Sequence, residues 1–371
     1  MNSRMIFSIF QTCVLIFIYF MSDCICTEGN KTSIQMGKNN TVGRTARVSI
    51  FQLVSQLSAT DNCKVSSGLM GTCLSAQDCI KRGGRGIETC AWGLGMCCVY
   101  ASSCGTTSTA NMTYFTSPGY PNTWTSNSGV CSFTVRPKLF SKICQLKLDF
   151  EEFYIAGPTS GMCSTDLFAV NGQDLNSIAP VICGQNTGQH MYLQVSSSTG
   201  PFRFTVTTSG ESDKRKWRIR ITQIPCGSTA MAPTHCLQYY TGAVGRFQSF
   251  NYGNIDTNED TYFINMNYAI CLRKEVAMCG AIFNAEGSFN VNVWSTTNPA
   301  DACKMEYLSF GTDRKCGYFP EGKFNATKLG NTGPMVITFA SDDKHQEDAT
   351  SPIHDTGFSF KYTQYSCSSG L

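Results

Sequence analysis

The sequence predicts an all-β protein, in which two antiparallel, jelly-roll-like β-sandwich domains follow a small, disulfide-knotted N-terminal module. Hydrophobic and polar residues alternate in many short segments, such as Phe202-Arg203-Phe204-Thr205-Val206, and this pattern is typical of strands with one buried face. The 371 residues include 21 cysteines, far more than a reducing compartment would maintain as thiols. The cysteine pattern of the region before Cys226 also recurs between Cys236 and Cys367.

The first residues predict export from the cell. Arg4 precedes a mostly apolar run from Met5 to Phe20, and the residues around Cys24-Ile25-Cys26 fit a signal peptidase site. We expect residues 1–26 to be a signal peptide that is cleaved after Cys26. The alternative, an uncleaved signal anchor, would need a longer apolar run to span a bilayer. Neither a later membrane span nor a lipid-anchor signal is expected. Cleavage leaves 18 cysteines, an even number that suits a closed disulfide framework.

The segment after the signal peptide predicts an exposed, modified region. Residues 27–62 are polar and lack cysteine, so we expect a linker or pro-segment. Arg44-Thr45-Ala46-Arg47 has the R-x-x-R form that proprotein convertases cut. Processing after Arg47 is one interpretation, and two basic residues in a flexible tail is the other. Sequons for N-glycosylation agree with export and occur at Asn30, Asn39, Asn111 and Asn325.

Residues 63–100 predict a small unit held by crosslinks. The stretch has six cysteines, many glycines and little apolar material for a core, so disulfides must substitute for burial. Gly71-Thr72-Cys73, the spacing to Cys79 and the closing Cys97-Cys98 pair resemble a clip domain, the small knot found ahead of arthropod serine proteases. The resemblance implies the bonds Cys63–Cys97, Cys73–Cys90 and Cys79–Cys98. Zinc binding competes with this interpretation, but no histidine is interleaved.

Residues 104–226 carry the motifs of a known family. Cys104 is followed by a Ser-Pro-x-Tyr-Pro turn at residues 117–121, by Cys131-Ser132-Phe133-Thr134-Val135, by Cys163-Ser164-Thr165-Asp166 and by Cys183-Gly184. This pattern resembles a CUB domain, an extracellular β-sandwich. The resemblance implies the bonds Cys104–Cys131 and Cys163–Cys183, which leaves Cys144 to pair with Cys226.

Residues 236–367 repeat this plan and resemble a divergent CUB domain. Cys303-Lys304-Met305-Glu306 and Cys316-Gly317 match the second half of the pattern, and Phe339-Ala340-Ser341-Asp342 matches the family's F-x-S-D, but the opening half lacks the Ser-Pro-x-Tyr-Pro turn. The implied bonds are Cys236–Cys271 and Cys303–Cys316, which leaves Cys279 with Cys367. The whole arrangement resembles a group of secreted arthropod CUB-domain proteins, with which we also associate the stretch 186–192.

The family resemblance implies where calcium would bind. Many CUB domains hold Ca²⁺ with three acids, and carboxylate oxygens suit this ion. In the first unit Asp166 matches one acid, whereas the other two places fall at Ala156 and residues 208–210. In the second unit Glu306 and Asp342 match two of the three, and Asp301 is a loose candidate for the other. We therefore place a possible Ca²⁺ cofactor in the second unit, with a solvated acidic loop as the alternative.

Two further segments invite a chemical interpretation. Lys214-Arg215-Lys216-Trp217-Arg218-Ile219-Arg220 has the charge of a heparan-type glycan site. Its strict alternation favours a strand with one core face and one solvent face. Thr234-His235-Cys236 is similar to the His-Cys box of trypsin-like proteases, but no Gly-Asp-Ser-Gly-like turn follows to supply a nucleophile. We therefore expect no enzymatic activity.

Together these features predict a secreted, non-enzymatic protein that binds an extracellular protein or glycan. The net charge of +3 is too small to suggest a nucleic-acid partner. Two alternatives stay open. The clip-like module suggests a non-catalytic regulator of an extracellular clip-type serine protease cascade, and export suggests a venom or salivary component.

Overall fold

The computed structural model describes most of the chain from residue 62 onward. The described residues are 62–137, 142–173, 178–196, 200–212, 214–253, 262–291, 303–330, 335–343 and 356–367. They all lie in one compact unit, Ile50–Leu371. Among them the helical elements are α3 (Ala76–Lys81) and the 3-10 turn η1 (Ala91–Gly93), so the expected all-β class is confirmed. None of the described helices is long and apolar enough to cross a bilayer. The proposed signal peptide, Cys26, Arg47, Asn30, Asn39 and Asp301 lie outside the described residues.

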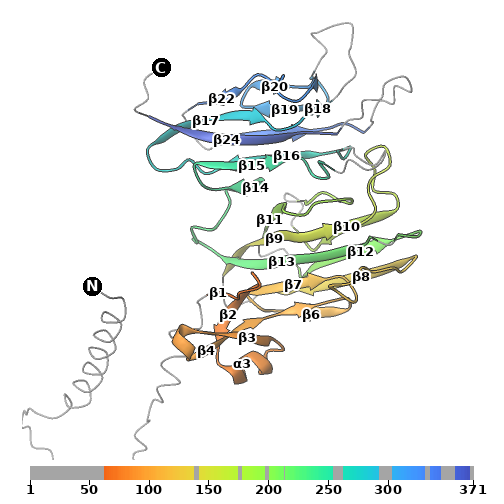
Figure 1. The fold of residues 1–371 in the computed structure, drawn as a ribbon, viewed down its shortest axis with the longest axis vertical. Helices are drawn as coiled ribbons and strands as arrows, with labels where there is room; N and C mark the ends of the chain where they lie inside the picture. The colour runs from red at the N-terminus through yellow and green to blue at the C-terminus, as the bar shows by residue number, and fades with distance from the viewer. Residues whose placement is uncertain are drawn as a thin grey trace, which may run out of the picture. The chain divides into compact units, whose positions relative to one another are not determined.

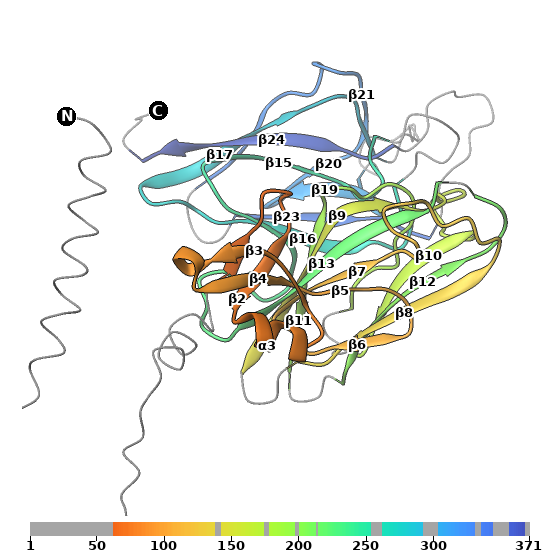
Figure 2. The same ribbon diagram turned by 60° about the horizontal axis from the view of Figure 1, so that its bottom comes forward.

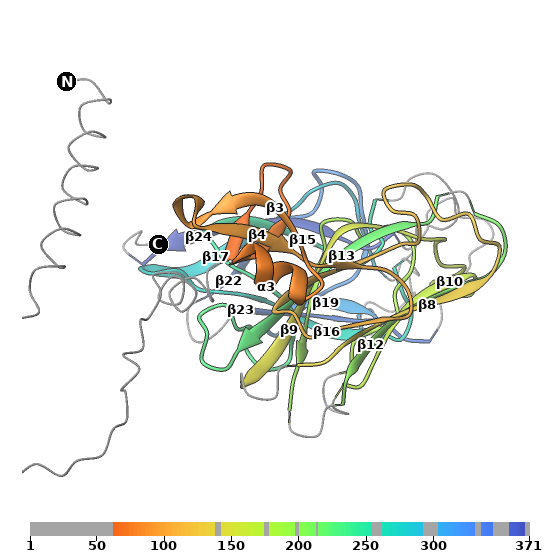
Figure 3. The ribbon, with the colours of Figure 1, turned by 90° about the horizontal axis from the view of Figure 1, so that it is seen from below.

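The six-cysteine module, residues 63–100, is a small antiparallel sheet with one helix beside it (Figures 2 and 3). The strands, in the order β1-β2-β4-β3, are β1 (Asn62–Lys64), β2 (Met70–Leu74), β4 (Gly95–Val99) and β3 (Arg85–Cys90). Helix α3 begins where the Oγ of Ser75 accepts a hydrogen bond from the Asp78 amide at 3.1 Å. Cys79, Cys97 and Cys98 are buried, so disulfide sulfur supplies much of the small core.

The first sandwich, residues 104–226 together with the preceding strand β5, is built from two sheets (Figure 1). One sheet has the order β11-β9-β13-β7-β5: β11 (His190–Gln194), β9 (Ile143–Tyr154), β13 (Lys216–Pro225), β7 (Met112–Thr116) and β5 (Ala101–Ser102). The other has the order β10-β12-β8-β6: β10 (Asp166–Asn171), β12 (Phe202–Thr208), β8 (Gly129–Val135) and β6 (Thr106–Ser108). Phe133, Phe204 and Trp217 are fully buried in the core, as their alternation with polar neighbours predicts. Neighbouring strands are antiparallel except β5 and β6, which run parallel to β7 and β8.

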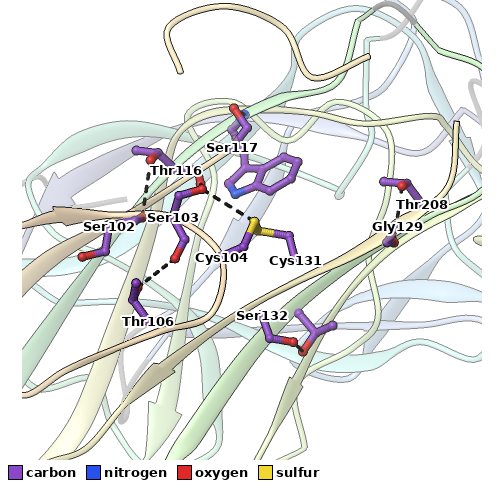
Figure 4. Close-up of a disulfide and its surroundings, with 12 residues drawn as sticks. Ser102, Ser103, Cys104, Thr106, Thr116, Ser117, Gly129, Cys131, Ser132 and Thr208 are labelled. Atoms are coloured by element: carbon purple, nitrogen blue, oxygen red, sulfur yellow. Dashed lines mark hydrogen bonds between the residues drawn. A yellow bond between two sulfur atoms is a disulfide. The ribbon is translucent and has the colours of Figure 1, made fainter. Parts of the chain in front are cut away.

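A disulfide ties the start of the first sandwich to its second sheet (Figure 4). Cys104 precedes β6 and is bonded to Cys131, which is fully buried on β8. Close to this bond, the Oγ of Ser103 donates to the carbonyl of Thr116 at 3.0 Å, and the Oγ1 of Thr106 donates to the carbonyl of Ser103 at 2.8 Å. The bond therefore fixes the corner where the chain passes from one sheet to the other.

The second sandwich, residues 236–367, repeats the two-sheet plan with shorter strands. One sheet has the order β14-β16-β23-β19-β20: β14 (Cys236–Tyr240), β16 (Asn267–Leu272), β23 (Met335–Ala340), β19 (Tyr307–Phe310) and β20 (Asp313–Lys315). The other has the order β15-β24-β17-β22: β15 (Val244–Gln248), β24 (Ser359–Ser366), β17 (Met278–Ala285) and β22 (Thr327–Leu329). A separate pair joins β18 (Phe289–Val291) to β21 (Gly317–Phe319). The pairing is antiparallel except between β14 and β16.

Disulfides occur in all three modules, and none of those described crosses from one module to another. The bonds join the same cysteines as the pairs expected above: Cys63–Cys97, Cys73–Cys90, Cys79–Cys98, Cys104–Cys131, Cys144–Cys226, Cys163–Cys183, Cys236–Cys271, Cys279–Cys367 and Cys303–Cys316. Two of them close long loops, because Cys144–Cys226 spans 82 residues and Cys279–Cys367 spans 88. Each ties an early strand of a sandwich to the end of its last strand, where crosslinking restricts the unfolded chain most.

Candidate functional site

The three places that the family pattern assigns to calcium ligands do come together in the first sandwich, but they surround an arginine. Asp166 stands at the start of β10 and is fully buried. Its Oδ2 accepts from the Ala156 amide at 2.9 Å, and its Oδ1 accepts from the Ser209 amide at 3.3 Å. Arg215, also fully buried, donates to both oxygens, from Nε at 2.7 Å and from Nη2 at 2.9 Å.

The remaining hydrogen bonds of Arg215 complete this arrangement. Its Nη1 donates to the carbonyl of Ser126 at 2.6 Å, and its Nη2 donates to the carbonyls of Ser209 and Gly210 at 2.9 and 3.0 Å. The guanidinium thus supplies a fixed positive charge among backbone carbonyls and one carboxylate, which are the groups a cation would use. The residues of the first sandwich therefore do not fit a calcium ion at this place.

In the second sandwich Glu306 and Asp342 lie at the same end of one sheet. Tyr307 pairs with Ala340 across β19 and β23, so the residue before β19 and the residues after β23 are neighbours. Glu306 is buried, and its Oε2 accepts from the hydroxyl of Tyr262 at 3.0 Å. The backbone carbonyl of Asp342 accepts from the Asn265 amide at 2.6 Å. Two of the three expected acids thus lie at the same end of this sheet. The described residues include no group of three metal-binding side chains.

The basic segment 214–220 is a paired strand rather than a free cationic patch. On β13 the buried Trp217, Ile219 and Ile221 alternate with cations that face the acids of β9. Lys216 pairs with Glu152 at 2.6 Å, Arg218 with Glu151 at 3.0 Å, and Arg220 with Asp149 at 2.8 Å. Burial acts to raise the pKa of Asp149, but Lys147 and Arg220 outweigh it and hold that pKa below its ordinary value. The strand interpretation of this segment is therefore the one that the contacts support.

A polar interface, which we define by its buried side chains, connects the two sandwiches. Asn186, Gln189 and His190 belong to the first, and Gln238 and Asn251 belong to the second. The Nε2 of Gln189 donates to the carbonyl of Ser249 at 2.9 Å, and its Oε1 accepts from the Nε2 of Gln238 at 2.8 Å. One side chain thus makes a donor and an acceptor contact across the polar interface.

Asn251 both donates and accepts hydrogen bonds across the same polar interface. The Asn251 amide donates to the Oδ1 of Asn186 at 2.9 Å, and the Gln185 amide donates to the Oδ1 of Asn251 at 3.0 Å. Gly184 has a φ of +70°, and a Cβ at this position would overlap the side-chain amide of Asn251. The glycine of the Cys-Gly motif is therefore required for the close approach of the second sandwich.

A buried histidine completes the polar interface. The Tyr239 amide donates to the Nε2 of His190 at 3.0 Å, so this nitrogen carries no proton. Burial, and in addition the charge of Lys147, lowers the pKa of His190 to about 4, against the partial opposition of Asp149. The stretch 186–192, associated above with a family group, therefore has a definite structural role that its sequence did not indicate.

The joint between the sandwiches, residues 227–235, is anchored to the first sandwich by hydrogen bonds. The fully buried Gln145 of β9 donates to the carbonyl of Ala232 at 2.8 Å and accepts from its amide at 2.9 Å. His235, the histidine of the protease-like fragment, lies exposed in a turn with a φ of +72°. Cys236, which follows it, is bonded to Cys271. These positions serve the connection between the two sandwiches.

The six-cysteine module displays a tryptophan at the tip between β3 and β4. Trp92 is fully exposed, at 101% of its reference area, and Leu94 is exposed at 54%. Ala91, Trp92 and Gly93 have φ values of +48°, +53° and +88°, and this conformation is unfavourable for the two L-residues by about 1–2 kcal/mol each. The preceding Cys90, bonded to Cys73, holds the tip in place. Strained turns with exposed aromatic side chains are typical of binding sites.

The glycosylation sequons within the described residues differ in accessibility. Asn325 is exposed just before β22. Asn111 is half-buried before β7, and its carbonyl accepts from the Gln223 amide at 2.8 Å. Asn325 therefore offers the more accessible acceptor for a glycan.

Comparison with known protein families matches both sandwiches. Residues 104–221 match the model of the CUB domain, and residues 233–365 match that of the animal CUB domain. The second match includes the opening half of the second sandwich, where the sequence lacks the expected turn. No curated protein matches the chain.

Solved structures with similarity to the chain include CUB-containing fragments of MASP-1 and MASP-1/3. The CUB1-EGF-CUB2 domains of rat MASP-1 are 13% identical and cover 70% of this chain and 99% of that chain, with a TM-score of 0.25. The CUB1-EGF-CUB2 domain of human MASP-1/3 is 15% identical and covers 69% and 100%, with a TM-score of 0.25. The MASP-1 CUB2 domain bound to Ca²⁺ is 20% identical and covers 32% and 98%, with a TM-score of 0.25.

Proposed function

Because the chain contains two CUB domains, we propose that it is secreted and acts as a non-enzymatic protein that binds an extracellular protein or glycan. CUB domains are non-catalytic modules that typically mediate extracellular interactions. The observation that carries the proposal is the polar interface, in which Gln189 and His190 of the first CUB domain bond directly to the second. Such a connection keeps the loops of both domains in fixed positions, and a preorganised surface loses less entropy on binding.

The disulfides support the extracellular part of the proposal, since bonds of this number form and persist in oxidising compartments. Expression in secretory cells tests it. We expect the protein in the medium, beginning at Thr27 or, after convertase processing, at Val48. Glycosidase treatment should increase its electrophoretic mobility, with Asn325 as the principal described site. Retention of an uncleaved chain in the membrane fraction would contradict secretion.

Partner capture tests the binding part of the proposal. Tagged mature protein is crosslinked in native extracellular fluid, recovered and compared with the same protein after reduction and alkylation. We expect a partner that the folded chain retains and the reduced chain does not. Recovery of the same molecules by both forms would contradict binding through the folded CUB surfaces.

A second candidate function, regulation of an extracellular clip-type protease cascade, is favoured by the exposed Trp92 on the clip-like module. An aromatic side chain on a rigid tip is the kind of residue that contributes most to protein interfaces. The test compares the mature protein with Trp92→Ala for binding to a purified clip protease. Val276→Ala, at a residue of the second domain exposed at 93%, is the control for loss of an exposed apolar side chain. Equal binding by both variants would end this candidate.

We also propose that calcium binds to the second CUB domain rather than to the first, with Glu306 and Asp342 among its ligands. The shared sheet edge of these two acids supports this proposal, and Arg215 opposes binding in the first domain. When bound, the ion would neutralise and order that edge. Calorimetric titration of the mature protein should show binding that Glu306→Gln and Asp342→Asn abolish and that Asp149→Asn preserves. The absence of heat and of a thermal shift would refute this proposal.

A further inference from the structure

The first CUB domain has a second group of basic residues on the sheet opposite β13. A hollow of about 440 Å³ on the solvent face of the sheet β10-β12-β8-β6 is lined by Thr107, Thr134, Arg136, Asn171 and Arg203, and by the turn residues Gly172 and Pro201. None of the described residues that line it is acidic. Arg203 lies on β12, and Arg136 directly follows β8, the neighbouring strand in the sheet.

The register of the sheet explains how this hollow forms. Thr107 of β6 pairs with Thr134 of β8, Thr134 pairs with Arg203 of β12, and Arg203 pairs with Asn171 of β10. Their neighbours along the strands, such as Phe133 and Phe202, are buried in the core. Because side chains alternate between the two faces, this row points outward. The side chains that face solvent thus form one continuous polar row across four strands.

The edge of the hollow has a fixed shape. Gly172 has a φ of +92°, and a Cβ there would overlap the carbonyl of Pro201, so the turn after β10 lies directly against the start of β12. Arg136 continues the pairing of β8, since its amide donates to the carbonyl of Ser108 at 2.9 Å. The polar groups therefore stand on a rigid sheet, where binding requires little reordering of the backbone.

The arginines of this hollow can bind an anionic ligand, whereas the cations of β13 are already paired with acids. Within the described residues Arg136 and Arg203 form no ion pair, whereas Lys216, Arg218 and Arg220 each pair with an acid of β9. Arg136 and Arg203 are both exposed. The guanidinium group presents a planar fork of donors that matches the oxygens of sulfate or carboxylate.

We propose that this hollow binds an acidic glycan, with Arg136 and Arg203 on a sulfate or carboxylate substituent and Thr107, Thr134 and Asn171 on sugar hydroxyls. Hydroxyl and amide groups both donate and accept, as sugar hydroxyls do. Among the side chains of the described lining residues, the ring of Pro201 alone is apolar, so this part of the hollow offers no aromatic or aliphatic anchor for a protein partner. The inference rests on the proposed binding function and adds a site and a ligand class to it.

The test measures binding of the mature protein to three probes: a heparin-derived octasaccharide, the same octasaccharide after desulfation, and a sialylated oligosaccharide. Arg136→Gln/Arg203→Gln should weaken binding of the acidic probe by about tenfold or more, because hydrogen bonds to charged groups are lost. Lys216→Gln/Arg218→Gln removes the same charge from the opposite sheet and should change the affinity by less than about twofold, because its cations are already paired. Thermal unfolding of both variants checks that the fold is retained.

The outcomes distinguish the inference from its competitors. Binding of the sulfated probe alone, or of the sialylated probe alone, supports the inference and identifies the anionic group. Equal losses in the two double variants would show a non-specific charge effect and overturn it, and a loss in the β13 variant alone would place the site on that strand. If no acidic probe binds while the chain still captures a protein partner, the inference fails and the proposed function stands.

Discussion

Arg215 and Asp166 form a fully buried, bidentate ion pair in the first CUB domain, with donor–acceptor distances of 2.7 and 2.9 Å. The carboxylate also accepts from the backbone amides of Ala156 and Ser209, which occupy places where the family pattern expects ligands of calcium. A covalently attached cation thus connects the loops that calcium would otherwise connect. We therefore expect the order of these loops to be independent of the calcium concentration.

The first prediction concerns this buried pair. Asp166→Ala leaves the guanidinium of Arg215 buried without its counter-charge, and breaking such a pair costs about 3–5 kcal/mol. We therefore expect a loss of this size in the free energy of unfolding, measured by urea denaturation with the disulfides intact. Calcium should not restore the lost stability.

Two variants serve as controls for this prediction. Glu152→Ala breaks the partly exposed pair with Lys216 and should cost no more than about 1 kcal/mol. Asp166→Leu/Arg215→Met removes both charges and should recover part of the loss: no unpaired buried charge remains, but the backbone amides and carbonyls that bonded to the pair lose those partners. If Asp166→Ala is no more destabilising than Glu152→Ala, the pair does not hold the loops.

The second prediction is a pH dependence of stability that arises from His190. In the unfolded chain His190 binds a proton near its ordinary pKa of 6.5, whereas in the folded chain it is protonated only when the pH falls to about 4. The unfolded state therefore binds more protons in this window. The contribution to stability is fully present above pH 6.5 and is lost as the pH falls towards 4. Between pH 7.5 and 5.5 the expected loss is about 1 kcal/mol.

Replacement of histidines isolates this effect. In His190→Gln the side-chain oxygen can accept from the Tyr239 amide without titrating, so the stability difference between pH 7.5 and 5.5 should shrink. His235→Gln, at an exposed histidine outside the polar interface, is the control. Denaturation curves of both variants at pH 7.5 and 5.5 measure these stability differences. A difference that persists in full in His190→Gln would assign the effect to other groups.

The third prediction concerns the disulfides. Peptide mapping of the unreduced mature protein should recover the nine pairs present in the structure, each within one module. The adjacent Cys97 and Cys98 require a cut between them, by partial reduction or by fragmentation in the mass spectrometer. A bond between modules would contradict the division of the chain into three parts.

Much of the fold follows from patterns that are local in sequence. The alternation along residues 202–208 predicts a strand with one buried face, and β12 has that face. Likewise, residues 216–221 alternate between basic and apolar side chains. In β13 the basic side chains face the acids of β9 and the apolar ones pack in the core. Such patterns are readable because each side chain's environment is set by its position in a strand of period two.

The candidate sites depended on contacts that no local pattern encodes. Arg215 lies 49 residues from Asp166, and its burial among carbonyls follows from the folding of several loops. The row from Thr107 to Asn171 appears only when four strands are aligned in register. The stretch 186–192 was noticed for its family association, but its contacts are to residues of a different domain. Side-chain contacts over such separations depend on the tertiary structure.

The fourth prediction concerns the polar interface. Gln189→Ala removes the acceptor of the buried Gln238 amide and the donor to the Ser249 carbonyl, and an unsatisfied buried amide costs about 1–3 kcal/mol. We expect reduced stability and faster cleavage of the joint 227–235 by limited proteolysis. Gln173→Ala, in a loop of the first domain away from the interface, is the control. Equal cleavage rates in both variants would contradict a stabilising role for Gln189.

Native-state hydrogen exchange of the mature protein tests most directly whether the two CUB domains act as one preorganised binding unit. The backbone amides of Tyr239 and Asn251 donate to His190 and Asn186 of the other domain, so they are protected only while the domains are in contact. The account predicts that both amides exchange as slowly as the core amides of β9 and β13. Exchange at the rate of an exposed loop would contradict it, because the two domains would then move independently.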